Sequence, residues 1–401
     1  MAIENQTPLD PTAFIFVCCQ HGSEKALKSE IAEAYPGLNF AFSRPGFLTF
    51  KLTPEASLPL KFSLTSTFAR TSGWSFGKTT GDDAAVLIDE VLKSPAARVC
   101  DHVHVWQRDT HVPGKKGFEP GQSILADEMA GLIAASLERK DRKVAPNQVA
   151  KANDLILDVV MVEPNEWWFG FHYATTTAGR WPGGVPKIDA SQEVISRAYF
   201  KLDEALLWSG IKINPGDVCA EIGSAPGGAC QLLLEQGAIV IGVDPAEMET
   251  EVLENPNFTH IRRRGNEVRK KDLRSVRWLM ADVNAAPTYT LDTIEEMVTS
   301  SSVDVTGVVL TLKLVDMKFA DQIGEFRKRV KGLGFSVVKT RQLAFNRGEI
   351  CLVGVKDRFA LRSSRQRARV TKKPEADKPA STKPVKVELV GGKTEMLGKN
   401  K

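Results

Sequence analysis

Residues 221–237 read EIGSAPGGACQLLLEQG, and this stretch decides the fold. The apolar run before it predicts a strand that ends at Gly223, and the run after it predicts a helix that begins near Gly227. Glycines between a strand and a helix let the backbone approach a bound ligand closely. We therefore expect a ligand-binding turn of an α/β domain at this place.

Three kinds of ligand-binding turn can be compared with this stretch. A P-loop carries a lysine after its last glycine, whereas Ala229 and Cys230 follow Gly228. A dinucleotide-binding turn carries a glycine where Ala225 stands, so that pattern fails as well. The third kind binds S-adenosylmethionine (SAM), for which the glycines accommodate an uncharged methionine and an adenosine instead of phosphates. A purely structural turn stays open as an alternative.

The pattern of strands extends on both sides of the turn. Residues 191–360 alternate strand-like and helical runs, which predicts a Rossmann-like, mostly parallel seven-stranded sheet with right-handed crossovers. The last two runs, FSVVKT and GEICLVGV, are too closely spaced for a helix between them, so we expect an antiparallel pair at one edge. The run AIVIGVD ends in Asp244, an acid that suits hydrogen bonds to the ribose hydroxyls of either NAD or SAM.

Further polar residues stand at the expected ends of strands. Asp282 ends WLMAD, Lys313 follows the apolar run VVLTL, and Glu349 precedes the run ICLVGV. Ligands of open α/β sheets bind at the carboxyl ends of the strands. Lys313 is therefore either a functional residue with a perturbed pKa or a surface residue just past its strand. Lys201, beside the apolar stripe of an expected helix at 195–210, can equally be a solvated helix lysine.

The first part of the chain has a different pattern. Residues 14–175 read as a mixed α/β region with two βαβ-like passes, which fits a pair of small domains, and a glycine- and proline-rich linker follows at 176–190. His102 and His104 alternate on an expected strand, but no cysteine or acid pair completes a metal site. We therefore expect no metal.

Composition and charge exclude several classes of protein. The 401 residues carry a net charge of +4, and no apolar run approaches the roughly 18 residues of a membrane span. The N-terminus lacks the basic region of a secretory signal, and the six cysteines include no CxxC pair. These features indicate a cytoplasmic protein with buried free thiols.

The charge is concentrated at one end of the chain. Residues 361–401 hold twelve Lys or Arg against four Asp or Glu, a net +8, so residues 1–360 carry −4. The tail is rich in lysine and contains three prolines, and we expect it to be disordered. It either contacts nucleic acid or acts as a solubilising tail.

Several segments together resemble a known family. SRAYFKLDEA, EIGSAPGG, VDPAEM, WLMADV, LTLKLV and NRGEICLVG occur in the order and spacing of the FtsJ-like ribose 2′-O-methyltransferases. Over about residues 14–358 the chain is similar to the RlmM branch, the large-subunit ribosomal RNA cytidine 2′-O-methyltransferases. FVCCQHGSEKALKSEIA, FSLTSTFARTSGWSFG and KTRQLAFNRGE carry that closer match. The resemblance implies SAM-dependent methylation of a ribose 2′-hydroxyl, at a cytidine of large-subunit (23S-type) ribosomal RNA.

The resemblance also implies roles for single residues. The family's catalytic Lys-Asp-Lys-Glu tetrad maps onto Lys201, Asp282, Lys313 and Glu349. We expect Lys313, with a pKa lowered by burial and by the second lysine, to accept the hydroxyl proton. Lys201 would hold or polarise the ribose, and the two acids would orient the lysines. The implied SAM site comprises Ser196, Gly223, Ala225, Pro226, Gly227, Gly228, Asp244 and Asp282.

Two features depart from the family's pattern. Glu221 stands where the family usually has Asp, and RRRGN at 262–266 replaces the acid expected after the third strand. The segment 262–277 holds eight basic residues against two acids. We call it the basic cluster, and it is either an RNA-contacting patch or a solvated surface.

The same resemblance implies the division of the chain. A ferredoxin-like domain at 1–80 and a THUMP-like RNA-binding domain at 81–175 would precede the linker, the methyltransferase domain at 191–360 and the basic tail at 361–401. We expect a monomer that binds ribosomal RNA and no membrane.

Two other functions compete with this one. A catalytically inactive RNA-binding protein of the same fold is the main alternative, and the complete tetrad argues against it. An NAD-dependent oxidoreductase is disfavoured because the GxGxxG pattern fails and His260 is the only histidine of residues 191–360.

Overall fold

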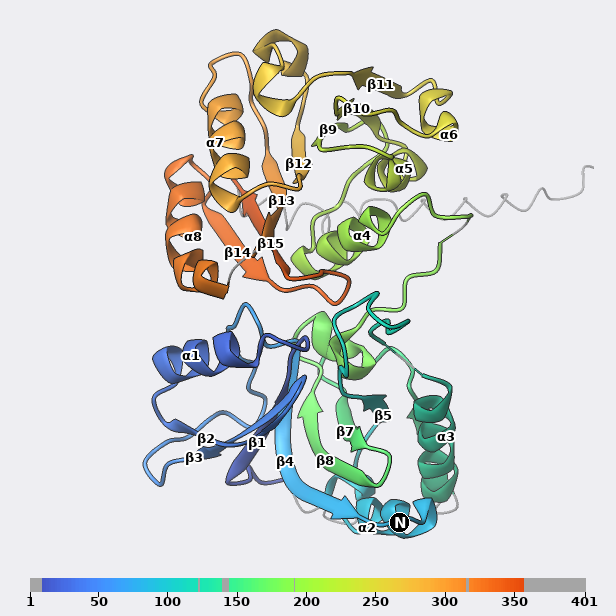
Figure 1. The fold of residues 1–401 in the computed structure, drawn as a ribbon. Helices are drawn as coiled ribbons and strands as arrows, with labels where there is room; N and C mark the ends of the chain where they lie inside the picture. The colour runs from blue at the N-terminus through green and yellow to red at the C-terminus, as the bar shows by residue number, and fades with distance from the viewer. Residues whose placement is uncertain (1–8, 122, 139–143, 191, 315–316, 357–401) are drawn as a thin grey trace, which may run out of the picture.

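The computed structural model describes residues 9–121, 123–138, 144–190, 192–314 and 317–356. Two α/β halves lie one above the other in Figure 1, each built around its own sheet. We call residues 9–190 the N-terminal half and residues 192–356 the C-terminal half. The predicted basic tail at 361–401 lies outside the described residues.

A single eight-stranded sheet runs through the N-terminal half, in the order β2-β3-β1-β4-β8-β7-β5-β6. Its strands are β1 (Phe14–Cys18), β2 (Leu38–Arg44), β3 (Phe47–Leu52), β4 (Thr71–Thr80), β5 (His102–Gln107), β6 (Ala145–Pro146), β7 (Leu155–Glu163) and β8 (Glu166–Tyr173). Its helices are α1 (Glu24–Ala34), α2 (Ala84–Leu92) and α3 (Ile124–Glu138), with short 3-10 helices at Ala96–Arg98, Ala178–Arg180 and Pro182–Gly184.

Strand β4 connects the two segments that were expected to form separate domains. It pairs antiparallel with β1 on one side and with β8 on the other, so strands from before and after residue 80 share one sheet. Trp74 of β4 and Trp167 of β8 are almost fully buried in one hydrophobic core, together with Phe171, the register partner of Trp74. Because buried aromatic rings of this size dominate core energetics, the two segments fold around a common core.

The C-terminal half contains a seven-stranded sheet in the order β11-β10-β9-β12-β13-β15-β14. Four pairings are parallel, and the two that involve β15 are antiparallel. The strands are β9 (Val218–Ile222), β10 (Ile239–Val243), β11 (Phe258–Ile261), β12 (Trp278–Asp282), β13 (Gly307–Lys313), β14 (Val337–Arg341) and β15 (Glu349–Val355). The helices are α4 (Ala198–Ser209), α5 (Gly228–Glu235), α6 (Thr250–Leu253), α7 (Pro287–Val298) and α8 (Ile323–Gly332), with 3-10 helices at Gly265–Glu267, Lys270–Leu273 and Met317–Gln322.

The direction of β15 decides where the candidate site lies. Because β15 runs opposite to β13, its first residue, Glu349, stands beside Lys313, the last residue of β13. The expected antiparallel pair is confirmed by the pairing of β14 with β15, in which β14 forms the edge. Residues from β12, β13 and β15 therefore meet at the carboxyl edge of the sheet.

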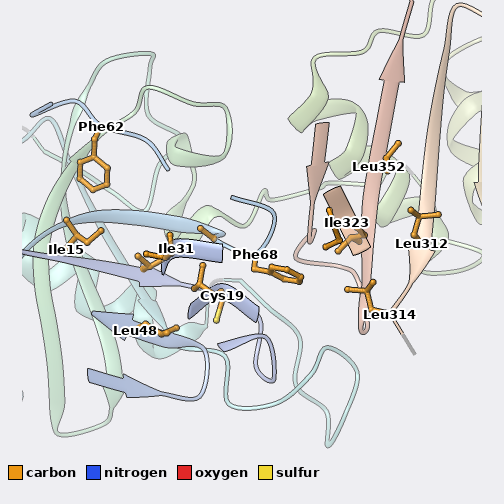
Figure 2. Packing of buried hydrophobic residues seen from close by; sticks show 14 of the residues in the cluster. Ile15, Cys19, Ile31, Leu48, Phe62, Phe68, Leu312, Leu314, Ile323 and Leu352 are labelled. Atoms are coloured by element: carbon orange, nitrogen blue, oxygen red, sulfur yellow. The ribbon is translucent and has the colours of Figure 1, made fainter. Parts of the chain in front are cut away.

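Apolar side chains join the two halves. One hydrophobic cluster contains Ile15 and Ile31 of the N-terminal half together with Leu312 and Ile323 of the C-terminal half. Figure 2 shows Phe68 between these two groups, with its ring directed toward the C-terminal half. Phe68 is only 3% exposed. The halves are therefore packed against each other through a continuous core.

Candidate active site

Four charged side chains from separate elements meet at the carboxyl edge of the C-terminal sheet. Lys201 comes from α4, while Asp282 ends β12, Lys313 ends β13 and Glu349 begins β15. Strand register places the last three, because Asp282 is paired with Thr311, two residues before Lys313, and Lys313 is paired with Glu349. The structure thus brings together all four residues that the sequence singled out, and we call them the tetrad.

The tetrad forms a closed ring of alternating charge. Lys201 Nζ lies 3.0 Å from Asp282 Oδ2 and 2.5 Å from Glu349 Oε1. Lys313 Nζ lies 3.0 Å from Asp282 Oδ1 and 2.5 Å from Glu349 Oε2. Three of these ion pairs are also hydrogen bonds, whereas the contact between Lys201 and Glu349 is not aligned as one. Each carboxylate therefore bridges both ammonium groups.

The ring lies largely out of contact with water. The Glu349 side chain is 3% exposed, and the other three members are 14 to 18% exposed. Charges at this depth are tolerated when they are paired, and removing one partner leaves a charge without compensation. The four side chains therefore hold one another in place as a unit.

The pKa of Lys313 is shifted in the direction opposite to the expected one. Burial lowers the pKa of its ammonium, but the attraction of Asp282 and Glu349 outweighs burial and holds the pKa above its ordinary value. The prediction of a lowered pKa is wrong for this arrangement, because it counted the second lysine and not the two carboxylates between the lysines. For Asp282, burial raises the pKa, while Lys201 and Lys313 outweigh it and hold the pKa below its ordinary value. Lys313 and Asp282 are therefore both charged at neutral pH.

The glycine turn at 223–228 passes over the same edge of the sheet. Gly223 has a φ of +81°, and a Cβ at this position would stand 2.7 Å from the carbonyl oxygen of Asp282. A Cβ at Gly228 would stand 2.2 Å from the hydroxyl oxygen of Ser196. Both approaches are too close for a side chain, which explains the glycines. The turn is thereby packed against Asp282 at its first glycine and against Ser196 at its last.

Asp244 follows β10 directly and faces this turn. Its Oδ2 accepts a hydrogen bond from the backbone N–H of Ala225 at 3.3 Å, and its Oδ1 accepts one from Ala246 at 2.8 Å. Pro226 and Gly227 complete the turn, and Gly227 has a φ of +128°. Each carboxylate oxygen of Asp244 keeps a further acceptor position, so the side chain can receive hydroxyl donors from a ligand.

A fifth ionisable group lies beside the tetrad. Glu221 of β9, noted from the sequence only as a departure from the family's pattern, lines the same small cavity as Lys201 and Asp282. Burial raises the pKa of Glu221 to about 8 against the hydrogen bond that the Cys230 thiol donates to it at 3.1 Å. This carboxyl is therefore mostly protonated at neutral pH and adds little charge to the ring.

The loop between β14 and β15, residues 342–348, leads directly into Glu349. The carboxylate of Glu204, one turn after Lys201 on α4, accepts the backbone N–H groups of Ala344 at 2.9 Å and Phe345 at 3.1 Å. In Figure 1 this loop lies next to the N-terminal half. The helix that carries one tetrad lysine thus also fixes the loop before a tetrad acid.

Gln20 holds the same loop from the N-terminal half. Its side chain is buried, and its Nε2 donates to the carbonyl of Asn346 at 2.6 Å. Its Oε1 accepts from Gln342 Nε2 at 3.3 Å and from the Gly348 N–H at 3.4 Å, and the Gly348 carbonyl accepts from Leu314 next to the tetrad at 2.9 Å. No sequence pattern signals this support, because Gln20 and Asn346 are 326 positions apart.

The histidines considered as metal ligands have structural partners. His104 Nε2 lies 2.8 Å from the carbonyl of Gln148, and His102 Nε2 lies 2.9 Å from Asp154 Oδ2. Within the described ranges, no group of three or more His, Cys, Asp or Glu side chains is placed to bind a metal. The same ranges contain no helix with the length and apolar composition that crossing a membrane requires. All six cysteines are buried, as predicted.

The basic cluster follows β11, at the edge of the sheet opposite β14. Four of its eight basic residues form ion pairs with acids: Arg262 with Glu247, Arg269 with Asp272, Lys270 with Glu296 and Arg277 with Asp304. An RNA contact at this place would compete with these pairs.

The residues at the carboxyl edge of the C-terminal sheet can together bind and deprotonate a hydroxyl group. The charged ring can hold a hydroxyl group by charge-assisted hydrogen bonds, and one of its lysines can take up the hydroxyl proton. The glycine turn beside it can receive a ligand that lies close to the backbone. The arrangement therefore suits the activation of a substrate hydroxyl next to a second bound molecule.

A family model that describes FtsJ-like methyltransferases matches residues 194–348. The matched range contains the glycine turn and three members of the tetrad, and the fourth, Glu349, is the next residue.

Three relatives are named ribosomal RNA large subunit methyltransferase M. The protein from Halorhodospira halophila is 31% identical over 110 residues, which are 27% of this chain and 32% of that protein. The protein from Xanthomonas oryzae pv. oryzae is 34% identical over 113 residues, with the same shares of 27% and 32%. The protein from Histophilus somni is 25% identical over 152 residues, which are 36% of this chain and 42% of that protein. The matched stretches thus span about a third to two fifths of the length of these relatives.

Solved structures are similar at a low level. The Methanococcus jannaschii fibrillarin pre-rRNA processing protein is 14% identical, with a TM-score of 0.32, and the match covers 51% of this chain and 84% of that one. TrmN from Thermus thermophilus is 12% identical, with a TM-score of 0.31, and the match covers 85% of this chain and 99% of that one.

Proposed function

We propose that this chain, whose residues 194–348 form an FtsJ-like methyltransferase domain, is a SAM-dependent methyltransferase that modifies a ribose 2′-hydroxyl of large-subunit ribosomal RNA. The observation that carries the proposal is the closed ring of the tetrad beside the glycine turn. The target nucleotide in this proposal is a cytidine, a choice that rests on the resemblance to the RlmM branch.

The residues at the glycine turn fit the proposed binding of SAM. When bound, SAM supplies a methyl group on a sulfonium, so the leaving group needs no proton. The acceptor positions of Asp244 suit the two ribose hydroxyls of an adenosine. Gly223 packs against the backbone carbonyl of Asp282, so the glycine turn lies beside that member of the proposed site. The site would be formed by Ser196, Gly223, Ala225, Pro226, Gly227, Gly228, Asp244 and Asp282.

The tetrad would act on the RNA hydroxyl. A ribose hydroxyl becomes a good nucleophile only as its proton leaves, so Lys313 in its amine form would accept that proton. SAM, held by the glycine turn and Asp244, would supply the methyl carbon that the 2′-oxygen attacks and the sulfur that leaves with the electron pair of the broken bond. Lys201 would hold the ribose in line for this displacement, and Asp282 and Glu349 would orient both lysines.

The N-terminal half would hold the RNA. We assign it a ferredoxin-like part at 1–80 and a THUMP-like part at 81–175, and the contact of Gln20 with the loop 342–348 supports its place beside the site. The basic tail at 361–401 would add RNA affinity. We propose a cytoplasmic monomer.

Transfer of a labelled methyl group tests the proposal. The purified full chain is incubated with methyl-labelled SAM and large-subunit ribosomal RNA from a strain that lacks the gene, and the RNA is digested to nucleosides. The expected product is 2′-O-methylcytidine. Label in a base would overturn the assignment of the hydroxyl. The absence of SAM binding by calorimetry would favour the inactive RNA-binding protein.

A further inference from the structure

A cavity of about 400 Å³ lies between the two halves and away from the tetrad. Segments of residues 62–72 and 172–179 form its wall in the N-terminal half. Trp208 at the end of α4, Arg327 of α8 and residues 338–341 of β14 form its wall in the C-terminal half. No member of the tetrad lines this cavity, so it is a separate feature of the molecule.

The lining of this cavity contains basic residues and no acidic ones. Arg341, Lys339 and Arg327 line the cavity from the C-terminal half, Arg70 lines it from the N-terminal half, and none of its lining residues is Asp or Glu. Serine and threonine hydroxyls from both halves make up much of the remaining wall. Ser66 already donates its hydroxyl to Glu30 behind the wall, and the other hydroxyls and the basic side chains suit a phosphate group.

Two buried arginines of this cavity differ in their partners. Arg70 makes a bidentate ion pair with Asp109, at 2.7 and 2.6 Å. The Arg341 side chain makes one hydrogen bond and no ion pair with any residue that the structure describes, and that bond runs from Nη2 to the carbonyl of Arg70 at 2.6 Å. Arg341 is 9% exposed. The nearby Glu204 already accepts two backbone N–H groups of the loop 342–348.

The pKa of Arg341 agrees with this lack of an anion. Burial lowers the pKa to about 10; Glu204 acts to raise it and Arg70 acts to lower it further. Arg341 therefore remains charged at neutral pH, although its surroundings disfavour the charge. A bound anion would supply the missing compensation.

We infer that this cavity binds a phosphate of the substrate RNA backbone, an inference that rests on the proposed function. Arg341 forms the inner end of the site, and the exposed Lys339 and Arg327 draw the strand in at its rim. Arg341 is paired with Cys351, two residues from Glu349 on β15, so an RNA strand whose ribose reaches the tetrad passes close to the cavity. Phosphate contacts of this kind fix the register of a nucleic acid without reading its bases.

The salt dependence of RNA binding tests the inference with a matched pair of variants. Arg327→Gln with Lys339→Gln removes the two rim charges, and Lys328→Gln with Lys331→Gln removes two exposed charges of α8 that do not line the cavity. Affinity for a ribosomal RNA fragment is measured by fluorescence anisotropy over a series of KCl concentrations. The first variant should flatten the slope of log K against log[salt] by about 0.7, the value for one contact to a single strand. Its KM for RNA should rise while its affinity for SAM is kept.

The control variant should keep the wild-type slope and KM. Equal slopes for the two variants would overturn the inference. This readout needs no methyl transfer, so it separates a failure of the phosphate site from a failure of the proposed activity.

A second probe uses inorganic phosphate and Trp208. At constant ionic strength, phosphate should change the tryptophan fluorescence of the full chain, and the change should be lost in Trp208→Phe and weakened in Arg341→Lys. Arg341→Lys keeps the charge, so a thermal melt like that of the wild type separates lost binding from lost folding. A phosphate response without any change of RNA salt slope in the rim variant would overturn the assignment to the RNA backbone.

Discussion

At the scale of single residues, the tetrad is a closed ring in which positive and negative charges alternate. Each carboxylate bridges two lysines, and each lysine contacts both carboxylates. Lys313 is the proposed proton acceptor, while Asp244, Ser196 and the glycine turn form the proposed SAM site. Substitution of Lys313 should therefore separate chemistry from cofactor binding.

Lys313→Met tests this separation, because methionine keeps the length of the side chain and removes the amine. We expect the rate of methyl transfer to fall by at least about 100-fold, the usual contribution of a general base. The Kd for SAM, measured by calorimetry, should stay within the error of the wild type. Lys212→Met, a change at an exposed lysine, is the control and should leave both quantities unchanged. Full activity of Lys313→Met would remove Lys313 from the mechanism.

The pH dependence of the reaction follows from the raised pKa of Lys313. Only the deprotonated amine can accept a proton, so kcat/KM for RNA at saturating SAM should rise from pH 7 to pH 9, with a slope of about one logarithmic unit per pH unit. Glu349→Gln removes one of the two attracting carboxylates, so the pKa of Lys313 falls and the rising limb moves to lower pH. A limb that moves to higher pH in Glu349→Gln would refute this account of the charge.

The positions of the tetrad residues could be predicted from the sequence, whereas their charge state and their supporting contacts could not. Asp282, Lys313 and Glu349 could be found because strand ends meet at one edge of an α/β sheet. The direction of the Lys313 pKa shift could not be predicted, because it depends on whether burial or the attraction of the two carboxylates is larger in the folded ring. Glu204 and Gln20 carry no motif, and their role follows only from contacts made across the fold.

At the scale of elements, the loop 342–348 is the structure on which Glu349 depends. It is bound on one side by Glu204 of α4 and on the other by Gln20 of the N-terminal half. Gln20→Ala should release the second contact and let Glu349 drift from its place in the ring. Because small errors of alignment are costly in displacement reactions, we expect kcat to fall between about 10- and 100-fold.

The same variant should keep its affinity for SAM, since the glycine turn is not touched by Gln20. Gln107→Ala, a change at a half-buried glutamine of β5, is the matched control and should keep the wild-type kcat. Single-turnover rates and SAM titrations measure the two effects separately. If Gln20→Ala retains the wild-type kcat, the loop is held well enough by Glu204 alone.

Elements with a regular apolar pattern could be predicted, and others could not. The strands around the glycine turn have uninterrupted apolar runs, so their order and approximate ends are visible in the sequence. Strand β4 lacks such a signal because the glycines of TSGWSFGKTT interrupt its pattern. Helix α7 lacks one because its buried face includes Thr290 and Thr293 as well as apolar residues.

At the scale of the whole molecule, the two halves share a core, and Phe68 is the side chain that links them most directly in Figure 2. Phe68→Ala should lower the free energy of unfolding by about 3–5 kcal/mol, as expected for the loss of a buried phenyl ring. Phe40→Ala, at a ring that is 50% exposed and lies under the Lys28 ammonium, should cost about 1 kcal/mol at most. Urea titrations followed by circular dichroism compare the two variants, and equal losses would mean that Phe68 is not part of a common core.

The arrangement of the halves is what the sequence could predict least. Strand β4 closes the N-terminal sheet by pairing with β1 and β8, and Gln20 and Phe68 reach the C-terminal half across long separations in the chain. Such contacts depend on how the folded helices and strands pack together, and the local hydrophobic pattern of the sequence does not encode them. The proposed division into ferredoxin-like and THUMP-like parts lies within this one sheet.

Mapping of alkali-resistant bonds in the RNA tests whether the tetrad directs methyl transfer to a ribose 2′-oxygen. A methylated 2′-oxygen cannot attack the adjoining phosphate, so the bond next to a modified nucleotide survives alkali. After incubation of the full chain with SAM and large-subunit ribosomal RNA, we predict one new resistant bond, at a cytidine, that is absent with Lys313→Met. Methyl incorporation without a resistant bond, or a resistant bond formed equally well by Lys313→Met, would contradict the account.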